Sequence, residues 1–381
     1  MIAALFPRSD YPALDQHTYL NQASLGLIGQ PAAQAMHTFL DEIGRHGNLN
    51  MTDKEEVDFF ESLRERGARL LRCKPSQLAI LASASEMLGQ LPFLLRPPKG
   101  SNIVLVSSDF PAITRPWIQY AIASDCELVF VEDRASENLT DTLENAIGKE
   151  TRVVAISAVQ FATGSVVDIP RLRRATARVN AQLVIDATQM AGAMPVDAAE
   201  WGADAVVTSG YKWLGGHGGV ALAALSSALL KKDPLLPGWM GTPEPFAFDA
   251  TRSPFAPDAR RFTQSTMSYV SIAGLCKALD QLKSIGEARL VRHAQALSLA
   301  LVAGAHPYGW RPFHPHATSG AAPHIISLAH DTIDAVAAVE TLRKQHIVCS
   351  ARNGRIRVSI APYTDTKDID RLINGLSKIH S

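Results

Sequence analysis

In the stretch VIDATQMAGAMPVDAAEWGADAVVTSGYKWLGG, residues 184–216, two charged residues stand at or just past the ends of apolar runs. Asp186 closes one apolar run, and Lys212 stands just past the next one, residues 203–210. A helix is expected between them, over residues 189–202, which makes the unit a strand–helix–strand crossover. If the two strands are neighbours in a parallel sheet, both charges lie at its carboxyl edge and face one crevice.

Apolar runs alternate with helical patterns on either side of this stretch. Buried, β-rich runs separated by helices are typical of a mostly parallel sheet covered by helices on both faces, so we predict an α/β fold. The expected strands cover residues 77–83, 101–108, 126–132, 152–158, 182–188 and 203–210, and the expected helices include 85–95, 111–124 and 271–286.

The length of the chain indicates two domains, since 381 residues exceed one ordinary core. Residues 231–261 are rich in proline and aromatic residues and read as a long irregular connection. We therefore predict a large cofactor-binding domain over residues 21–250 and a small C-terminal α/β domain over 251–381. Residues 1–20 are expected to pack with the small domain, and Thr366 is expected to cap the last helix.

Charge and cysteine content narrow the class of protein. Lys and Arg total 37, as do Asp and Glu, so the balance suggests neither a nucleic acid nor a membrane as partner. No apolar run has membrane-spanning length. The four cysteines are far apart, which disfavours disulfides and fits a soluble, cytoplasmic protein. The histidines of residues 306–330 lack metal-ligand spacing, and no metal is expected.

A carboxylate and a lysine across one crevice are the pair that pyridoxal 5'-phosphate needs. The lysine forms a Schiff base with the aldehyde of this cofactor, and the carboxylate keeps its pyridine nitrogen protonated. The phosphate needs a helix N-terminus with hydroxyl groups, which residues 83–85 supply after a predicted strand. Phe110, at the end of another strand, is a candidate to cover the ring.

Five segments, in chain order, resemble the class V aminotransferase family of pyridoxal-phosphate enzymes. The central pattern is Asp-x-x-Gln, then Ser-Gly-(His or Tyr)-Lys, within residues 186–212. The other segments are TYLNQASLG (18–26), SASEMLGQL (83–91), RFTQSTMSY (261–269) and GRIRVSIAPYTDTKDIDRLINGL (354–376). The resemblance covers most of the chain and implies fold type I, with a large and a small domain.

For the cofactor, the resemblance implies a role at each matching position. Lys212 would hold pyridoxal phosphate and then move the substrate's Cα proton. Asp186 would pair with the pyridinium, Gln189 would contact the ring hydroxyl, and Phe110 would lie over the ring. The phosphate would be bound at four positions of this subunit, namely Ala84, Ser85, Ser209 and Tyr211.

For the substrate, the resemblance implies an amino acid bound at a site shared within a homodimer. Arg357 would hold the α-carboxylate through its planar fork, with Asn21 and Ala23 beside it. Thr266 would reach the phosphate bound by the partner subunit. Arg352 and Arg355 flank Arg357, so the choice among the three arginines rests on the family pattern.

Departures from the family pattern bear on the reaction. Cys349 lies eight residues before Arg357, which leaves no room for the mobile cysteine loop of a desulfurase. Tyr211 and Phe110 stand where desulfurases carry histidines and look more like kynureninase. Ile113, however, replaces an aspartate of kynureninase, so kynurenine is not the expected substrate.

Several reactions stay open on these grounds. Lyase-type cleavage of a C–S or other Cβ bond is favoured. A class V aminotransferase of specialised metabolism and an amino-acid epimerase are the alternatives within the family. A non-catalytic regulator that binds pyridoxal phosphate is the alternative from another class. Participation of His217 or Arg115 is left open.

Overall fold

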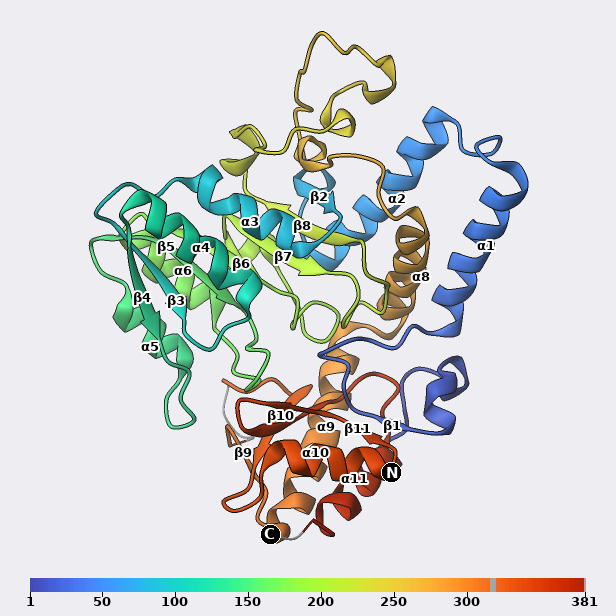
Figure 1. Cartoon of the computed structure of the whole chain (residues 1–381), viewed down its shortest axis with the longest axis vertical. Helices are drawn as coiled ribbons and strands as arrows, with labels where there is room; N and C mark the ends of the chain where they lie inside the picture. The colour runs from blue at the N-terminus through green and yellow to red at the C-terminus, as the bar shows by residue number, and fades with distance from the viewer. Residues whose placement is uncertain (316–319, 380–381) are drawn as a thin grey trace.

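The computed structural model describes residues 1–315 and 320–379 of the chain, so His316 lies outside the described residues. Figure 1 shows a large lobe around one sheet and a small lobe around another, with the N-terminal segment beside the small lobe. The sheet of the large lobe has seven strands, in the order β2 (Leu78–Leu81), β8 (Ala221–Leu225), β7 (Ala205–Ser209), β6 (Gln182–Asp186), β5 (Thr151–Ser157), β3 (Asn102–Val106) and β4 (Glu127–Val131).

The large sheet is parallel except for β8, which runs antiparallel to both of its neighbours, β2 and β7. The six predicted strands are all present, whereas β8 was not predicted. Its signal is the apolar run VALAAL, residues 220–225, directly after the glycine cluster. Because β8 reverses direction, β2 and β7 point the same way and end at the same edge of the sheet.

Helices cover both faces of this sheet, as predicted (Figure 1). Alternate strand residues point to opposite faces and enter two separate apolar cores. One face carries α3 (Ala84–Leu95) and α4 (Pro111–Ser124). The other face carries α2 (Asp53–Leu71), α5 (Leu139–Ala146), α6 (Ile169–Arg178) and α8 (Tyr269–Ile285), with α1 (Gln30–His46) packed along α8.

The predicted helix over residues 189–202 is wrong for most of its length. Only α7 (Ala198–Trp201) is helical, and turns, one isolated bridge and irregular residues occupy the rest. Gly192 has a φ of +90°, and a Cβ there would lie 2.7 Å from the carbonyl oxygen of Trp213. Pro195 follows three residues later and cannot donate a helical hydrogen bond. The segment therefore follows the backbone next to Lys212 instead of forming a helix.

The small lobe packs helices on an antiparallel sheet. Its strands are ordered β12 (Ser350–Arg352), β13 (Arg355–Ser359), β10 (Ile325–Ala329) and β9 (Arg311–Pro312), and its helices are α9 (Glu287–Ala305), α10 (Ala335–Lys344) and α11 (Thr366–Leu376). The predicted cap of α11 was one residue off. Asp365, not Thr366, is the N-cap, and its carboxylate accepts a hydrogen bond from the amide of Asp368 at 3.1 Å.

The N-terminal segment is joined to the small lobe by backbone pairing. Strand β1 (Thr18–Tyr19) lies parallel to β11 (Ile347–Val348). The amide of Leu5 donates to the carbonyl of Pro362 at 2.7 Å. Contacts between residues far apart in sequence therefore hold the N-terminal segment against the small lobe.

Residues 231–261 form an irregular connection with short 3-10 turns, as expected, and part of it stands away from the sheet (Figure 1). The turns include Trp239–Gly241, Pro245–Ala247 and Ala259–Phe262. Among the described residues, no helix combines the length and apolar character needed to cross a membrane.

Candidate active site

A cavity of about 180 Å³ lies at the carboxyl edge of the large sheet, where β2, β6 and β7 end. The first turn of α3 and the start of α4 close two of its sides. Seven predicted cofactor positions line it: Ala84, Ser85, Phe110, Asp186, Ser209, Tyr211 and Lys212. The edge expected from strand direction is therefore where these residues meet.

Lys212 is buried, with 6% of its surface exposed. Two contacts from the N-terminal segment fix its backbone: Gln22 Nε2 donates to the carbonyl of Lys212 at 2.8 Å, and the amide of Gly26 donates to the carbonyl of Tyr211 at 3.0 Å. Its Nζ lies 5.0 Å from the ring centre of Phe110 and 5.7 Å from that of Tyr211. The ammonium therefore meets aromatic surface and little water.

The surroundings of Lys212 lower its pKa from 10.5 to about 8. Burial is the main cause, because it penalises the charged form. Arg357 and Arg352 lower the pKa further by repulsion, and Asp186 opposes the shift by attraction. A larger fraction of neutral amine is thus present near neutral pH than for an exposed lysine.

Asp186 ends β6 and is buried beside the cavity. Its Oδ1 accepts a hydrogen bond from the amide of Thr188 at 2.8 Å. Burial raises its pKa, while the hydrogen bonds from Thr188 and the charge of Lys212 act in the opposite direction. The carboxylate is held in place and partly desolvated, so a cationic ring nitrogen would be a favourable partner.

The first turn of α3 forms a cradle for an anion. Ser83 is the N-cap, and its hydroxyl accepts from the amide of Glu86 at 3.1 Å. Glu86 in turn accepts from the amide of Ala82 at 2.9 Å. The amides of Ala84 and Ser85 begin the helix, where N–H groups have no intrahelical partner, and both residues line the cavity.

Gln189 lies behind the cavity rather than in its lining. Its Nε2 donates to the carbonyl of Ala23 at 3.0 Å, and its Oε1 accepts from Trp213 Nε1 at 2.7 Å. His324 Nε2 lies 2.7 Å from the carbonyl of Gln189. Burial lowers the pKa of His324 to about 4, so this histidine is neutral. The sequence interpretation considered His324 only as a possible metal ligand, among the histidines of residues 306–330, and nothing in the pattern around it indicates a contact with Gln189.

Arg357 is buried on β13 and points toward the N-terminal loop. Its Nη1 donates to the carbonyl of Phe161 at 2.9 Å, and its Nη2 donates to Asn21 Oδ1 at 3.4 Å and to Ser24 Oγ. Burial, and next the charge of Arg352, lowers its pKa to about 10. Its Nε is buried without a hydrogen-bond partner among the described residues.

The two flanking arginines differ in position. Arg352 Nη2 donates to Ser24 Oγ at 3.3 Å, so Arg352 and Arg357 converge on one hydroxyl. Arg355 instead lies over the ring of Phe313, 5.0 Å from its centre. Strand alternation alone did not separate these residues, whereas the structure places Arg352 and Arg357 near the lysine.

Asp109 is a buried residue of the site that sequence analysis missed. Its carboxylate accepts hydrogen bonds from Ser157 Oγ at 2.6 Å, from the amide of Ser157 at 2.7 Å and from Gln160 Nε2 at 3.0 Å. Burial raises its pKa to about 6. The signal was available, because Asp109 follows an apolar run as Asp186 does. It braces the turn that presents Phe110.

Other candidates lie outside the cavity. Thr266, His217 and Arg115 are exposed, and none of them lines it. Cys349 is buried in the small lobe, and burial raises the pKa of its thiol to about 12. It adjoins the tight β12–β13 hairpin, which makes it a core residue rather than a nucleophile. Among the described residues, no cluster of three His, Cys, Asp or Glu side chains could hold a metal.

The donor set of this cavity fits pyridoxal phosphate. A desolvated lysine, a buried carboxylate and a helix N-terminus with free amides surround it. These features, on a mostly parallel sheet with a small lobe alongside, define a pyridoxal-phosphate enzyme of fold type I.

The family follows from comparison with known proteins. The profile of the family "Aminotransferase class-V" matches residues 18–372. The chain belongs to this family of pyridoxal-phosphate enzymes, as the sequence motifs predicted.

Relatives within the family carry different names. The "Uncharacterized aminotransferase YcbU" of Bacillus subtilis (strain 168) is 25% identical over 97% of this chain and 96% of its own length. A kynureninase of Bacillus anthracis is 27% identical over 71% of this chain and 66% of its own. A probable cysteine desulfurase of Methanothermobacter thermautotrophicus is 24% identical over 76% and 73%.

Solved structures agree on the fold. The cystine C–S lyase C-DES, in complex with cysteine persulfide, superposes with a TM-score of 0.87 at 22% identity, covering 97% of this chain and all of its own. The apo cysteine desulfurase of Thermococcus onnurineus NA1 has a TM-score of 0.87 at 19% identity, covering 97% and 96%. At these identities, the similarity describes the shared architecture.

Proposed function

We propose that the chain catalyses a lyase reaction in which it cleaves a bond at Cβ of an amino acid, with Lys212 as the proton-transferring group. The observation that carries this proposal is the desolvated Lys212, whose pKa is lowered to about 8, on the same side of the fold as Arg357. Lys212 can remove a proton, and Arg357 can bind a carboxylate. An amino acid carries both a proton at Cα and an α-carboxylate.

Each proposed step uses side chains of this site. Bound pyridoxal phosphate supplies an electron sink for charge that develops at the substrate's Cα. Asp186 would hold the ring nitrogen, and the amides of Ala84 and Ser85 would hold the phosphate. Arg357 would bind the α-carboxylate, which replaces its present neutral acceptors.

Proton transfer is assigned to Lys212. Its neutral Nζ would take the Cα proton and pass a proton to the leaving group at Cβ. The side chain then departs as its protonated form, and water converts the remainder to a 2-oxo acid and ammonia. The rings of Phe110 and Phe161, edge to face at 5.4 Å, provide an apolar wall that limits water near the reacting atoms.

The position of Cys349 supports a lyase that needs no cysteine nucleophile. Its thiol is buried in the core of the small lobe with a raised pKa. The other cysteines, Cys73, Cys126 and Cys276, do not line the cavity. Proton transfer by Lys212 therefore carries the proposed chemistry.

A product assay tests this function. The holoenzyme is incubated with a panel of L-amino acids, including sulfur-containing and aromatic ones, without a 2-oxo acid acceptor. We expect ammonia and 2-oxo acid in amounts many times the enzyme concentration, and release about 10²–10⁴-fold slower by Lys212→Ala. One turnover that stops until a 2-oxo acid is added would instead identify an aminotransferase, as the name of the Bacillus subtilis relative suggests.

We also propose that two subunits complete each site. Thr266 is exposed and outside the cavity of its own subunit, which leaves it available to a phosphate held by the partner. Mixing Lys212→Ala subunits with Thr266→Ala subunits tests this. Each hybrid dimer would contain one site that has both residues, so activity should exceed that of either variant alone. A fully active monomer in ultracentrifugation would contradict the proposal.

A further inference from the structure

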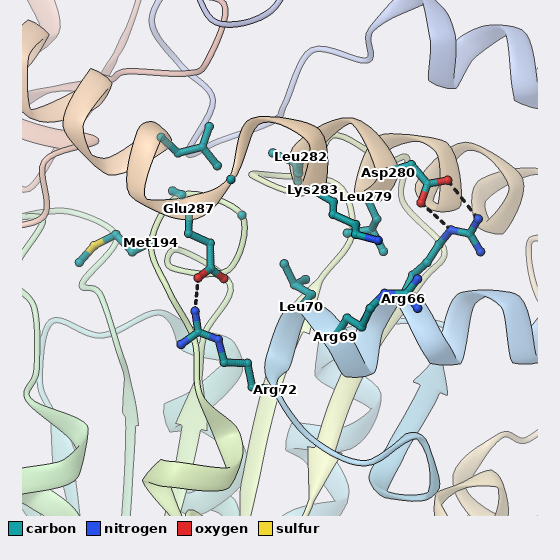
Figure 2. Close-up of a pocket in the computed structure, with 14 residues that line it drawn as sticks. Arg66, Arg69, Leu70, Arg72, Met194, Leu279, Asp280, Leu282, Lys283 and Glu287 are labelled. Carbon is teal, nitrogen blue, oxygen red and sulfur yellow. Dashed lines mark hydrogen bonds and ion pairs between the residues drawn. The ribbon is translucent and has the colours of Figure 1, made fainter.

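A second cleft lies between α2 and the junction of α8 with α9, and it shares no lining residue with the cofactor cavity. Its volume of about 470 Å³ is within the usual range for small-molecule sites, about 300–1,000 Å³. Figure 2 shows α8 above and α2 below the opening, with side chains from both helices directed into it. Gly286, with a φ of +82°, separates α8 from α9 at one end.

Two ion pairs span the cleft and join its walls. Near one end, Arg66 of α2 holds Asp280 of α8 through two hydrogen bonds of 3.0 Å each. At the other end, Arg72 pairs with Glu287 of α9 (Figure 2). Both carboxylates that line the cleft are therefore engaged by arginines.

Two further cations line the cleft without an anionic partner. Arg69 on α2 and Lys283 on α8 form no ion pair among the described residues. They come from opposite walls, as Figure 2 shows. Both residues are exposed to solvent, so each side chain can reach an anion that enters the cleft. An anion between them would be attracted by both charges and would accept hydrogen bonds from both.

The rest of the cleft is apolar. Leu70, Leu279, Leu282 and Leu290 supply branched side chains, and Met194 adds a flexible one that can adapt to an occupant. A small inorganic anion would leave this surface wet. The combination of apolar walls with two unpaired cations suits a molecule that has both an apolar body and an acidic group.

We propose that this cleft is a binding site for a small amphipathic anion, with a ring-sized apolar body against the leucines and a carboxylate between Arg69 and Lys283. The site is separate from amino-acid turnover at Lys212. One backbone contact lies between the two cavities: Gly192, which lines the cleft, packs against the carbonyl of Trp213, next to Lys212.

Calorimetric titration of the holoenzyme with 2-naphthoate tests the site. We expect saturable binding of one molecule per subunit. Acetate has the charge without the body, and 2-naphthalenemethanol has the body without the charge. Each should bind at least about tenfold more weakly, because each loses one of the two contributions.

Variants locate the binding. Arg69→Ala and Lys283→Ala should each weaken 2-naphthoate binding by up to about fivefold, because both residues are exposed and solvent weakens the attraction of an exposed charge pair. Lys277→Ala, an exposed lysine of α8 that does not line the cleft, is the matched control and should bind as the wild type does. A loss in only one of the two cleft variants still places the carboxylate in the cleft, on that cation.

Two results would overturn the proposal. One is the absence of saturable binding by the wild-type holoenzyme. The other is binding that neither Arg69→Ala nor Lys283→Ala weakens, which would place the naphthoate elsewhere. Arg357→Ala holoenzyme separates these sites, because the cleft should keep its affinity in that variant while a carboxylate at the active site would be lost.

Discussion

The cofactor cavity and the cleft between α2 and α8 are both lined by lysine and acidic side chains, but these side chains differ in their exposure to water. In the cavity, Lys212 and Asp186 are 6% and 5% exposed. Burial lowers the pKa of Lys212 and raises the pKa of Asp186, which favours the neutral form of each. In the cleft, the Arg72 side chain is 46% exposed and Asp280 is 44% exposed. The comparison indicates that burial, more than the charges nearby, lowers the pKa of Lys212.

The largest expected effect is that of Lys212→Ala. Loss of the group that moves the proton should lower kcat by about 10²–10⁴-fold. Lys277→Ala removes an exposed lysine and should leave kcat unchanged. Steady-state assays of 2-oxo acid release measure both. Equal activity of the two variants would show that the buried Lys212 contributes no more to catalysis than the exposed Lys277 does.

Arg357→Lys should have the next largest effect. The substitution keeps the positive charge but loses the planar fork that matches a carboxylate. We expect kcat/KM to fall about 10–100-fold, mainly through KM, as for loss of a charged hydrogen bond. Arg355→Lys, two residues away and over Phe313, is the matched control. A larger effect at position 355 would show that the wrong arginine has been assigned.

The pH dependence of the apoenzyme sharpens the contrast further. Free Lys212, with a pKa of about 8, must be neutral to react with the cofactor aldehyde. The rate of cofactor reincorporation should therefore rise with pH, with a midpoint at about pH 8, and level off well above that pH. Arg352→Ala should move this midpoint upward, because Arg352 lowers the lysine pKa, and Asp186→Asn should move it downward. Stopped-flow absorbance follows the reaction, and a midpoint near 10.5 would contradict burial as the cause.

The smallest effect is expected in the cleft. Asp280→Ala removes a half-exposed partner of Arg66, and such pairs contribute about 0–1 kcal/mol to stability. Urea unfolding of the wild type, Asp280→Ala, Arg66→Ala and the double variant gives the coupling energy between the two residues. A coupling above about 2 kcal/mol would mean that this cleft pair is as desolvated as the cavity.

Residues at strand ends were predictable from sequence, because the direction of parallel strands fixes where their carboxyl ends lie. Asp186, Lys212 and Ser85 meet in one cavity for that reason. The course of residues 189–197 was not predictable from periodicity, since the close approach of Gly192 to Trp213 depends on tertiary packing. The same holds for β8, whose antiparallel direction depends on its neighbours.

The hydrogen bonds that hold the site residues in place were harder to predict from sequence than the site residues themselves. Arg352 and Arg357 both donate hydrogen bonds to Ser24, which is more than 300 residues away in sequence. No local sequence pattern predicts that contact. His324 reaches the carbonyl of Gln189 across the two lobes in the same way. Asp109 is different, since the rule that found Asp186 also applies to it.

The pairing of β1 with β11 has a consequence for synthesis on the ribosome. Thr18 pairs with Ile347, and Gln22, which holds the backbone of Lys212, accepts a hydrogen bond from Tyr363 at 2.7 Å. Translation at about 5–20 residues per second separates these partners by tens of seconds. During that interval, the large sheet can form while the loop over Lys212 still lacks its support. The lysine site is therefore completed only after residues 347–363 have emerged.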